Sequence, residues 1–344
     1  MKKIKILSID GGGIRGIIPG VILTYLEKRL QVITNTTLKI GDYFDFIAGT
    51  STGGILACLY LIPGEDGKAK YSANDAVQLY LQEGKTIFAR SSYEKMLSLY
   101  TFFDPKFGVQ NLEKQLRQYF GDTKLDQLIK PCLITAYEIV QRNAVLFTSS
   151  DANDSLRNFF VRDVARATSA APTYFSPAHI QSDEGQSFFL SDGGVYANNP
   201  ALCAYAEARQ TEFKSLFKDE QKADFPTAKD MLIISLGTGT VKKQYHYKDF
   251  EHAGAIKWLE PIIDILMSAN SETVDFQLTK MYETLDPADA RDYYRIEPSL
   301  FEACSEMDDA SADNVEKLKQ AGLYFIDKNE ALLDEIANKV VANM

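Results

Sequence analysis

The chain has 344 residues with 45% hydrophobic and 24% charged side chains, a balance that excludes intrinsic disorder over most of its length. Its net charge of −10, without a dense run of lysine and arginine, excludes a protein that binds a nucleic-acid polymer through the phosphates. The four cysteines show no CxxC spacing, which excludes a disulfide scaffold or a zinc knuckle and predicts free thiols.

Short apolar segments alternate along the chain with segments of helical periodicity. The expected strands are, in chain order, Ile4–Ile9, Tyr43–Ala48, Leu133–Val140, Ala144–Thr148, Phe188–Leu190, Met231–Leu236 and Tyr293–Ile296. The expected helices start at Ile18, cover Ile55–Leu61, fill most of Ala73–Phe120, run from Pro200 to about Phe217 behind a cap at Asn198 or Asn199, and make up most of the chain after Asp249. Strands that alternate with helices predict an α/β fold with a mostly parallel sheet covered on both faces.

No linker rich in proline, glycine or serine divides the chain, so we expect a single domain over residues 1–344. Its core motifs occupy residues 4–240, and a C-terminal helical part covers about 250–344. The N-terminus is basic, but its apolar part is too short for a signal peptide, and no apolar stretch approaches the ~20 residues of a transmembrane helix. We therefore expect a cytoplasmic protein that contacts membranes peripherally, if at all.

A GxSxG motif follows the second expected strand and precedes a helix. Its residues are Gly49, Thr50, Ser51, Thr52 and Gly53. The glycines allow a sharp, strained turn that exposes the serine hydroxyl at a helix N-terminus, where the N–H group of Thr52 can help to stabilise an oxyanion. The strand-turn-helix context favours a nucleophilic Ser51 over an incidental serine in a glycine-rich turn.

A glycine-rich loop follows the first expected strand. Its residues are Asp10, Gly11, Gly12, Gly13, Ile14, Arg15 and Gly16. The pattern satisfies G-x-G-x-x-G, but residues 31–35 offer no acidic side chain for a dinucleotide ribose, and no Walker lysine follows. What remains is a set of backbone N–H groups that can hold an anion. Beside a nucleophilic serine, that anion is the tetrahedral oxyanion of acyl transfer.

The general base decides between a catalytic triad and a dyad. The three histidines of the chain are His179, His246 and His252, and their polar or unconstrained sequence surroundings favour surface or structural roles. Asp192 instead follows a short strand and precedes Gly193 and Gly194, which can aim its carboxylate into a cleft. By itself this segment also fits a simple Asp-Gly turn. Together with the other two motifs it favours Asp192 as the base.

In these three motifs the sequence resembles the patatin-like phospholipase family of lipid acyl hydrolases. Further segments that look like the family are Ala167–Phe175, Asn198–Pro200 and Leu232–Gly239. The resemblance covers roughly residues 4–240 and continues more weakly at Tyr294–Ile296 and Met307–Asp309. It implies a three-layer patatin-like fold with a mostly parallel central sheet flanked by helices.

The resemblance also implies a Ser–Asp dyad that works without histidine. Ser51 is then the nucleophile and Asp192 the general base, while Arg15 orders the glycine loop. The implied oxyanion hole is formed by Gly11, Gly12 and Gly13.

The expected activity is hydrolysis of fatty-acyl esters of phospholipids or related lipids, of the phospholipase A or lysophospholipase type. Two alternatives stay open, namely a lipid acyltransferase and a non-catalytic lipid-binding effector. No HExxH motif, EF-hand loop or Cys/His cluster occurs, so no metal or cofactor is expected. The expected partner is a lipid at a membrane or micelle surface, and the sequence identifies no activating partner or signal. An apolar cluster at Met96–Phe107 fits either an interfacial surface or ordinary core.

Overall fold

The computed structural model describes residues 1–88, 105–240 and 245–344, and within these ranges eight strands form one sheet. The strand order is β5-β6-β3-β2-β1-β7-β8, and β4 pairs with β3 beside this path. The strands are β1 (Ile4–Ile9), β2 (Phe46–Gly49), β3 (Cys132–Glu138), β4 (Asn143–Thr148), β5 (Ala178–Gln181), β6 (Ser187–Asp192), β7 (Met231–Leu236) and β8 (Tyr293–Ile296).

The sheet is parallel through its centre and antiparallel at one edge. Strands β3, β2, β1, β7 and β8 run in the same direction. Strands β4 and β6 both run antiparallel to β3, and β5 is antiparallel to β6. The hairpin between β3 and β4 is too short for the crossover that parallel neighbours need, so these two strands pair antiparallel. The predicted α/β fold with a mostly parallel sheet is confirmed.

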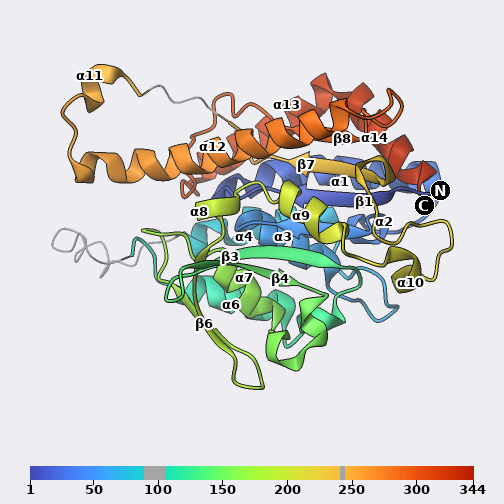
Figure 1. Cartoon of the computed structure of the whole chain (residues 1–344). Coiled ribbons are helices and arrows are strands. Elements are labelled where there is room, and N and C mark those ends of the chain that lie inside the picture. The colour runs from blue at the N-terminus through green and yellow to red at the C-terminus, as the bar shows by residue number, and fades with distance from the viewer. Residues whose placement is uncertain (89–104, 241–244) are drawn as a thin grey trace.

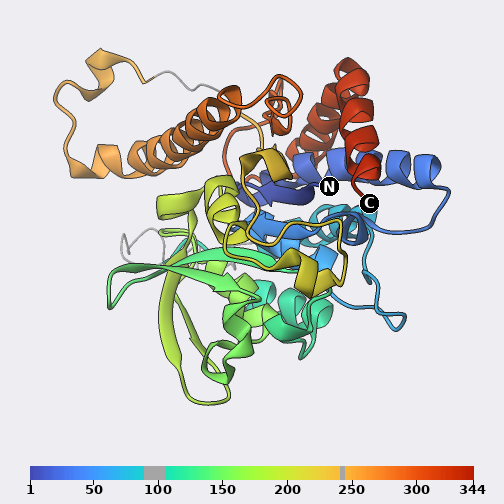
Figure 2. The same cartoon turned by 45° about the vertical axis from the view of Figure 1, so that its right-hand side comes forward.

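Helices cover both faces of the sheet (Figures 1 and 2). Side chains alternate along β1, so Leu7 and Ile9 enter one apolar cluster while Ile4 and Ile6 enter another. The first cluster is shared with α1 (Ile17–Thr34), α3 (Thr52–Leu61), α4 (Ala73–Ile87), α6 (Gln110–Phe120), α7 (Val161–Thr168), α13 (Ala312–Lys328) and α14 (Glu330–Ala342). The second is shared with α9 (Ala201–Ala208), α10 (Phe213–Phe217) and α12 (Ala255–Glu283).

The C-terminal residues complete the sheet and one helical layer. Strand β8 extends the sheet beside β7, and α13 and α14 pack against α1. The amide of Lys3 donates a hydrogen bond to the Asn343 side chain at 2.7 Å, so the two ends of the chain meet, as Figure 1 shows. Helix α12 is 29 residues long, and its N-terminal half extends beyond the sheet in both views.

Three sequence expectations differ from the structure in detail. The second strand begins at Phe46 rather than Tyr43, because Tyr43 ends the short helix α2 (Ile40–Tyr43). The expected helix from Pro200 to Phe217 ends at Ala208, and a separate helix α10 begins at Phe213, where the Asp224 carboxylate accepts the amide of Lys214 at 2.9 Å. Strand β5 was not expected. The pairing of β5 with β6 and the contact between Asp224 and Lys214 depend on the folded chain, so they leave no local pattern in the sequence.

The apolar cluster predicted at Met96–Phe107 lies largely outside the described residues, and its last member, Phe107, is buried. The four cysteines are free, as the sequence predicts, but only Cys58 and Cys132 are fully buried, while Cys203 and Cys304 are partly exposed. In the part of the chain that the structure describes, every helix is too short or too polar to cross a lipid bilayer.

Candidate active site

The three predicted motifs meet at one edge of the sheet. The parallel strands β1, β2 and β7 all end at this edge, where α/β proteins commonly bind ligands. The glycine loop follows β1, the turn with Ser51 follows β2, and Asp192 is the last residue of β6. Segments far apart in the sequence thus supply one site.

Ser51 occupies a strained turn between β2 and α3. Its φ of 54° and ψ of −122° place a non-glycine residue in a conformation that costs about 1–3 kcal/mol. Close packing enforces this turn, because a Cβ atom on Gly49 would lie 2.2 Å from the Gly53 carbonyl oxygen. A Cβ atom on Gly53 would lie 2.1 Å from the oxygen of Ile9. Ser51 precedes the first residue of α3, so the positive end of the helix dipole points at it.

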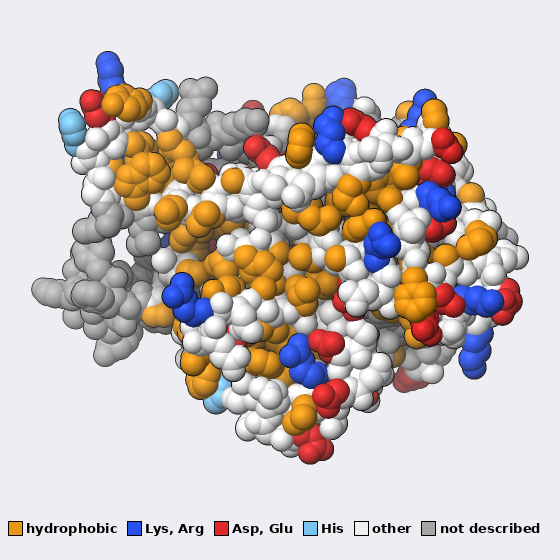
Figure 3. Space-filling view, in the orientation of Figure 1, with side chains coloured by type: hydrophobic (Ala, Val, Ile, Leu, Met, Phe, Trp, Pro, Cys, Tyr) orange, Lys and Arg blue, Asp and Glu red, His pale blue; other side chains and the backbone are white. Residues whose placement is uncertain are grey.

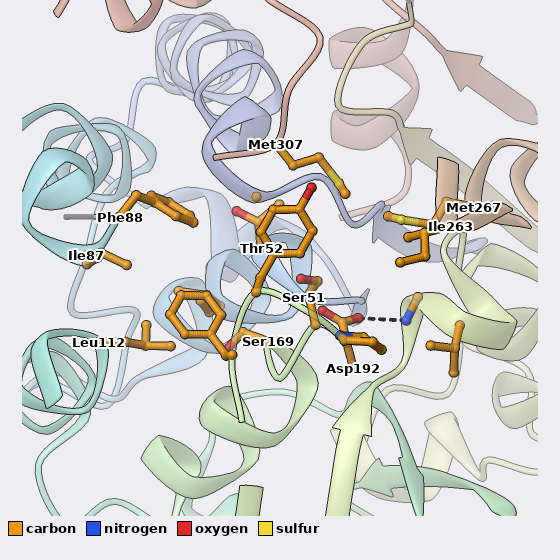
Figure 4. Close-up of a pocket in the computed structure, with 18 of the residues that line it drawn as sticks. Ser51, Thr52, Ile87, Phe88, Leu112, Ser169, Asp192, Ile263, Met267 and Met307 are labelled. Carbon is orange, nitrogen blue, oxygen red and sulfur yellow. Dashed lines mark hydrogen bonds between the residues drawn. The ribbon is translucent and has the colours of Figure 1, made fainter. Parts of the chain in front are cut away.

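Asp192 lies beside Ser51 with its carboxylate almost completely buried (Figure 4). One carboxylate oxygen accepts the amide N–H of Gly194 at 2.7 Å, and the Ser51 side chain lies beside the carboxylate in the same pocket (Figure 4). Burial raises the pKa of Asp192 to about 6, and the neighbouring Ser51 hydroxyl and Gly194 amide offset part of that rise. A carboxylate with this pKa is ionised at neutral pH and is more basic than an exposed aspartate.

The end of α7 holds both of these residues in place. The amide of Ser51 donates to the Thr168 hydroxyl at 2.8 Å, and the amide of Asp192 donates to the Ala170 carbonyl at 3.0 Å. The Ser191 hydroxyl also donates to Ala170. Sequence reasoning placed Thr168 in a segment that resembles the family, but it did not assign this positioning role.

We expect Thr168→Val to lower kcat about tenfold or more with little change in KM. The substitution keeps the side-chain shape but leaves the buried N–H group of Ser51 without its acceptor, at a cost of about 1–3 kcal/mol. Thr148→Val is the matched control, since buried Thr148 accepts the Asp151 amide at 3.0 Å away from the site. Equal losses of kcat in the two variants would contradict a specific role for Thr168.

The glycine loop packs against the serine turn. A Cβ atom on Gly11 would lie 3.3 Å from that of Ser51 and 2.5 Å from the Asn198 side-chain oxygen. The amide of Gly11 donates to the Asn198 carbonyl at 3.1 Å. This N–H group therefore holds the loop in place and is not available to an oxyanion. Gly13 has a φ of +58°, and its Cα faces the Met307 carbonyl so closely that no side chain fits.

Three other amides at this place remain available as donors. Among the described residues, no protein acceptor is assigned to the N–H groups of Gly12, Gly13 and Thr52. Thr52 begins α3 directly after Ser51, and Gly13 lines the same pocket as Ser51. The loop and the helix start therefore bring unpaired N–H groups next to the serine.

The two charged residues of the glycine motif, Asp10 and Arg15, hold the loop in place through contacts outside the catalytic pair. Arg15 donates to the Gly12 and Gly239 carbonyls, each at 3.3 Å. Asp10 forms a two-point ion pair with Arg295, at 3.0 and 2.7 Å, rather than facing Ser51. Arg295 also contacts Glu297, whose pKa burial raises to about 7. The role of Arg295 was not predicted, because its partner Asp10 lies 285 residues away.

The remaining motif glycines allow close contacts around the site. A Cβ atom on Gly16 would lie 2.3 Å from the Thr52 hydroxyl oxygen, and one on Gly193 would lie 2.0 Å from that of Thr135. Gly194 starts the short helix α8 (Gly194–Ala197) and donates the hydrogen bond to Asp192.

Ser51 and Asp192 lie in a pocket with mainly apolar walls. Figure 4 shows Ile87, Phe88 and Leu112 on one side of the pair, and Ile263 and Met267 of α12 on the other. The polar side chains of the lining come chiefly from the centre of the pocket, at Ser51, Thr52, Ser169 and Asp192. The arrangement can bind an aliphatic chain and present a carbonyl group to the serine.

The three histidines lie outside this pocket. His179 is exposed, stacks on Phe189 and pairs with the Ser187 hydroxyl at 2.7 Å. His246 and His252 are exposed as well. In the described ranges, no three His, Cys, Asp or Glu side chains are grouped to hold a metal ion.

Comparisons with known proteins agree with this architecture. A family model described as Patatin-like phospholipase matches residues 7–205. Patatin-like protein 2 of Oryza sativa subsp. indica is 34% identical, covering 97% of this chain and 86% of its own. Patatin-like protein 4 of Arabidopsis thaliana is 35% identical over 95% and 84% of the two chains. Patatin group D-2 of Solanum tuberosum is 34% identical over 94% and 84%.

The chain therefore belongs to the patatin-like phospholipase family, as the sequence motifs predict. Membership supports lipid acyl hydrolysis as its general activity. The crystal structure of VipD from Legionella pneumophila is a distant likeness, with a TM-score of 0.39 and 12% identity over 95% of this chain and 67% of its own. The assignment rests on the sequence matches.

Proposed function

We propose that this protein is a serine hydrolase that cleaves fatty-acyl esters of phospholipids or related lipids through a Ser51–Asp192 dyad. The observation that carries the proposal is the buried Asp192 carboxylate, which lies beside the Ser51 hydroxyl inside an apolar pocket (Figure 4). A carboxylate held in this way can act as a general base without an intervening imidazole.

In the first half-reaction, Asp192 removes the proton from Ser51 as the serine Oγ attacks the ester carbonyl carbon. The tetrahedral intermediate collapses when the alcohol or lysolipid leaves with the proton that Asp192 returns to it. The product on the protein is an ester between Ser51 and the fatty acyl group. The path for the proton is short because the two side chains lie side by side in the pocket (Figure 4).

The negative charge of the tetrahedral oxygen needs donors that are already in place. The N–H groups of Gly12 and Gly13 are the candidates in the loop, and that of Thr52 is the candidate at the start of α3. Gly11 is part of the same loop, but its N–H group is occupied by Asn198. Each such donor is worth about 2.7–4 kcal/mol of transition-state stabilisation in related chemistry.

In the second half-reaction, Asp192 removes a proton from water, and the resulting attack on the acyl-enzyme releases the fatty acid and restores Ser51. Phospholipase A or lysophospholipase specificity depends on which acyl ester reaches the serine. The apolar walls around Ile87, Phe88 and Leu112 suit the hydrocarbon chain of such an ester.

The test is a panel of radiolabelled lipids incubated with the purified protein, with Ser51→Ala as the control. We expect free fatty acid from the wild type and none above background from the variant. Adding an alcohol acceptor distinguishes hydrolysis from acyl transfer, because a transferase would form a new ester in its place. No product from any acyl lipid, with a folded protein, would contradict the proposal and favour a non-catalytic lipid-binding protein.

We also expect each of His179→Ala, His246→Ala and His252→Ala to keep activity within about tenfold of the wild type. All three side chains are exposed and outside the pocket, so no proton transfer depends on them. Initial rates on one lipid, with circular dichroism to check folding, measure this. A folded histidine variant as inactive as Ser51→Ala would replace the dyad with a triad.

A further inference from the structure

Helix α12 presents an apolar face to solvent in its N-terminal half. Trp258, Ile262, Ile265 and Leu266 are all exposed, and Ile262 and Leu266 expose 45% and 51% of their surface. Their spacing of four, seven and eight residues puts them on one side of the helix. Figure 3 shows hydrophobic side chains gathered along this part of α12 and toward α8 beneath it. We call these four residues, with exposed Val195 of α8, the α12 face.

The α12 face is continuous with the catalytic pocket. Leu266 and Val195 belong to both, because they are exposed to solvent and also line the pocket around Ser51. Ile263 and Met267 lie on the adjoining side of the helix and form part of the pocket wall. An apolar path therefore leads from the outer surface of α12 into the active site.

The charges around the face argue against an anionic partner. Asp264 and Lys257 lie on the opposite side of α12 by helical spacing, and Asp264 accepts a hydrogen bond from Tyr245 there. The protein carries a net charge of −10, which opposes its approach to an anionic surface. Apolar contact, rather than charge, is what this face offers.

From these observations we infer that the α12 face docks onto the surface of a lipid aggregate with zwitterionic or uncharged head groups and passes acyl chains into the pocket. The inference rests on the proposed function. A lipid surface suits the site because its molecules can move one at a time past Leu266 and Val195. A second protein or second copy held on the same face would instead cover the entrance. Tryptophan at the edge of an apolar face is also typical of contact with the membrane–water interface.

Trp258 gives a direct readout, because it is the single tryptophan of the chain and lies on the face. The Ser51→Ala variant, which should not consume lipid, is titrated with phosphatidylcholine vesicles. We expect a blue shift of the tryptophan emission and quenching by vesicles with brominated acyl chains. An unchanged spectrum at saturating lipid would overturn the inference, as would binding to phosphatidylserine vesicles alone.

The activity test uses the double variant Trp258→Ala, Ile262→Asp, neither of which lines the pocket. We expect a loss of at least tenfold on phosphatidylcholine vesicles and less than twofold on a dissolved short-chain ester. Leu216→Asp on α10 is the matched control, because Leu216 is 52% exposed and does not line the pocket. It should keep both activities. Equal losses on vesicles and on the dissolved ester would overturn the inference.

Failure of the inference and failure of the proposed function give different results. If the wild type binds vesicles through Trp258 but cleaves neither substrate, the proposed hydrolase function is wrong and lipid docking by the α12 face is supported. If the wild type cleaves the dissolved ester and no vesicle shifts the emission of Trp258, lipid docking by the α12 face is wrong and the proposed hydrolase function is supported. A dimer in sedimentation that Ile262→Asp dissolves, without vesicle binding, would assign the face to a second copy.

Discussion

Ser51→Ala is expected to abolish ester hydrolysis while the protein stays folded. The substitution removes the oxygen that attacks the ester carbonyl carbon and that lies beside the Asp192 carboxylate in the pocket (Figure 4). It also removes a hydroxyl group that lowers the pKa of Asp192, so the remaining carboxyl group should ionise at a higher pH. Single-turnover assays with radiolabelled lipid measure the residual rate, and circular dichroism measures folding.

Ser51→Gly is the matched variant for the turn itself. Glycine adopts the φ of 54° without strain, so we expect this variant to be inactive but at least as stable as Ser51→Ala, with a gain of about 1 kcal/mol or more. Denaturant unfolding compares the two. Turnover near the wild-type rate in either variant would exclude Ser51 as the nucleophile.

Asp192→Asn is expected to lower kcat by at least ~10²-fold, in the range for removal of a positioned base. The amide oxygen of asparagine can still accept the Gly194 N–H group, so the local structure should survive. The amide cannot take the serine proton. A folded Asp192→Asn protein with nearly wild-type activity would show that another group is the base.

The pKa of Asp192 also sets the pH dependence of the wild type. Because the carboxylate must be ionised to accept a proton, kcat/KM should rise with pH and level off above a midpoint near pH 6. An ordinary aspartate, with a pKa of 3.8, would put that midpoint about two pH units lower. Rates on a dissolved ester between pH 4 and pH 9 measure the midpoint. A flat profile from pH 4.5 upward would contradict the role of burial.

The same burial predicts that Asp192→Asn stabilises the fold at high pH. The folded pKa of about 6 lies above the usual 3.8, so Asp192 favours folding when it is neutral, below about pH 4. That contribution is lost as the pH rises through 6. The difference of about two units corresponds to about 3 kcal/mol, so the variant should be more stable than the wild type by up to that amount at pH 8.

Unfolding curves at pH 8 and pH 4.5 test this, and the advantage of the variant should shrink at the lower pH. A wild type that is the more stable protein at pH 8 would contradict the prediction. The site would then hold the charged carboxylate without cost. A loss of activity that accompanies a gain in stability is typical of residues kept for catalysis rather than for folding.

The sequence by itself determined the class of fold and the motifs of the site. Strands such as Ile4–Ile9 and Met231–Leu236 are short, fully buried and mostly apolar segments that end at glycine-containing turns, so they could be located within a residue. Ser51 could be singled out because its turn needs glycines at fixed positions, 49 and 53, which is a local requirement that leaves a local pattern. The family follows from the same three motifs in order.

Only the tertiary structure decided how these parts act on one another. Thr168 accepts the amide of Ser51, from which it is separated by 117 positions in the sequence. Arg295 pairs with Asp10, from which it is separated by 285 positions. The occupied amide of Gly11, the raised pKa of Asp192 and the open face of α12 likewise depend on what packs beside them. Hydrogen bonds, burial and exposure of this kind are properties of distant segments brought together. The sequence around each residue therefore carries no sign of them.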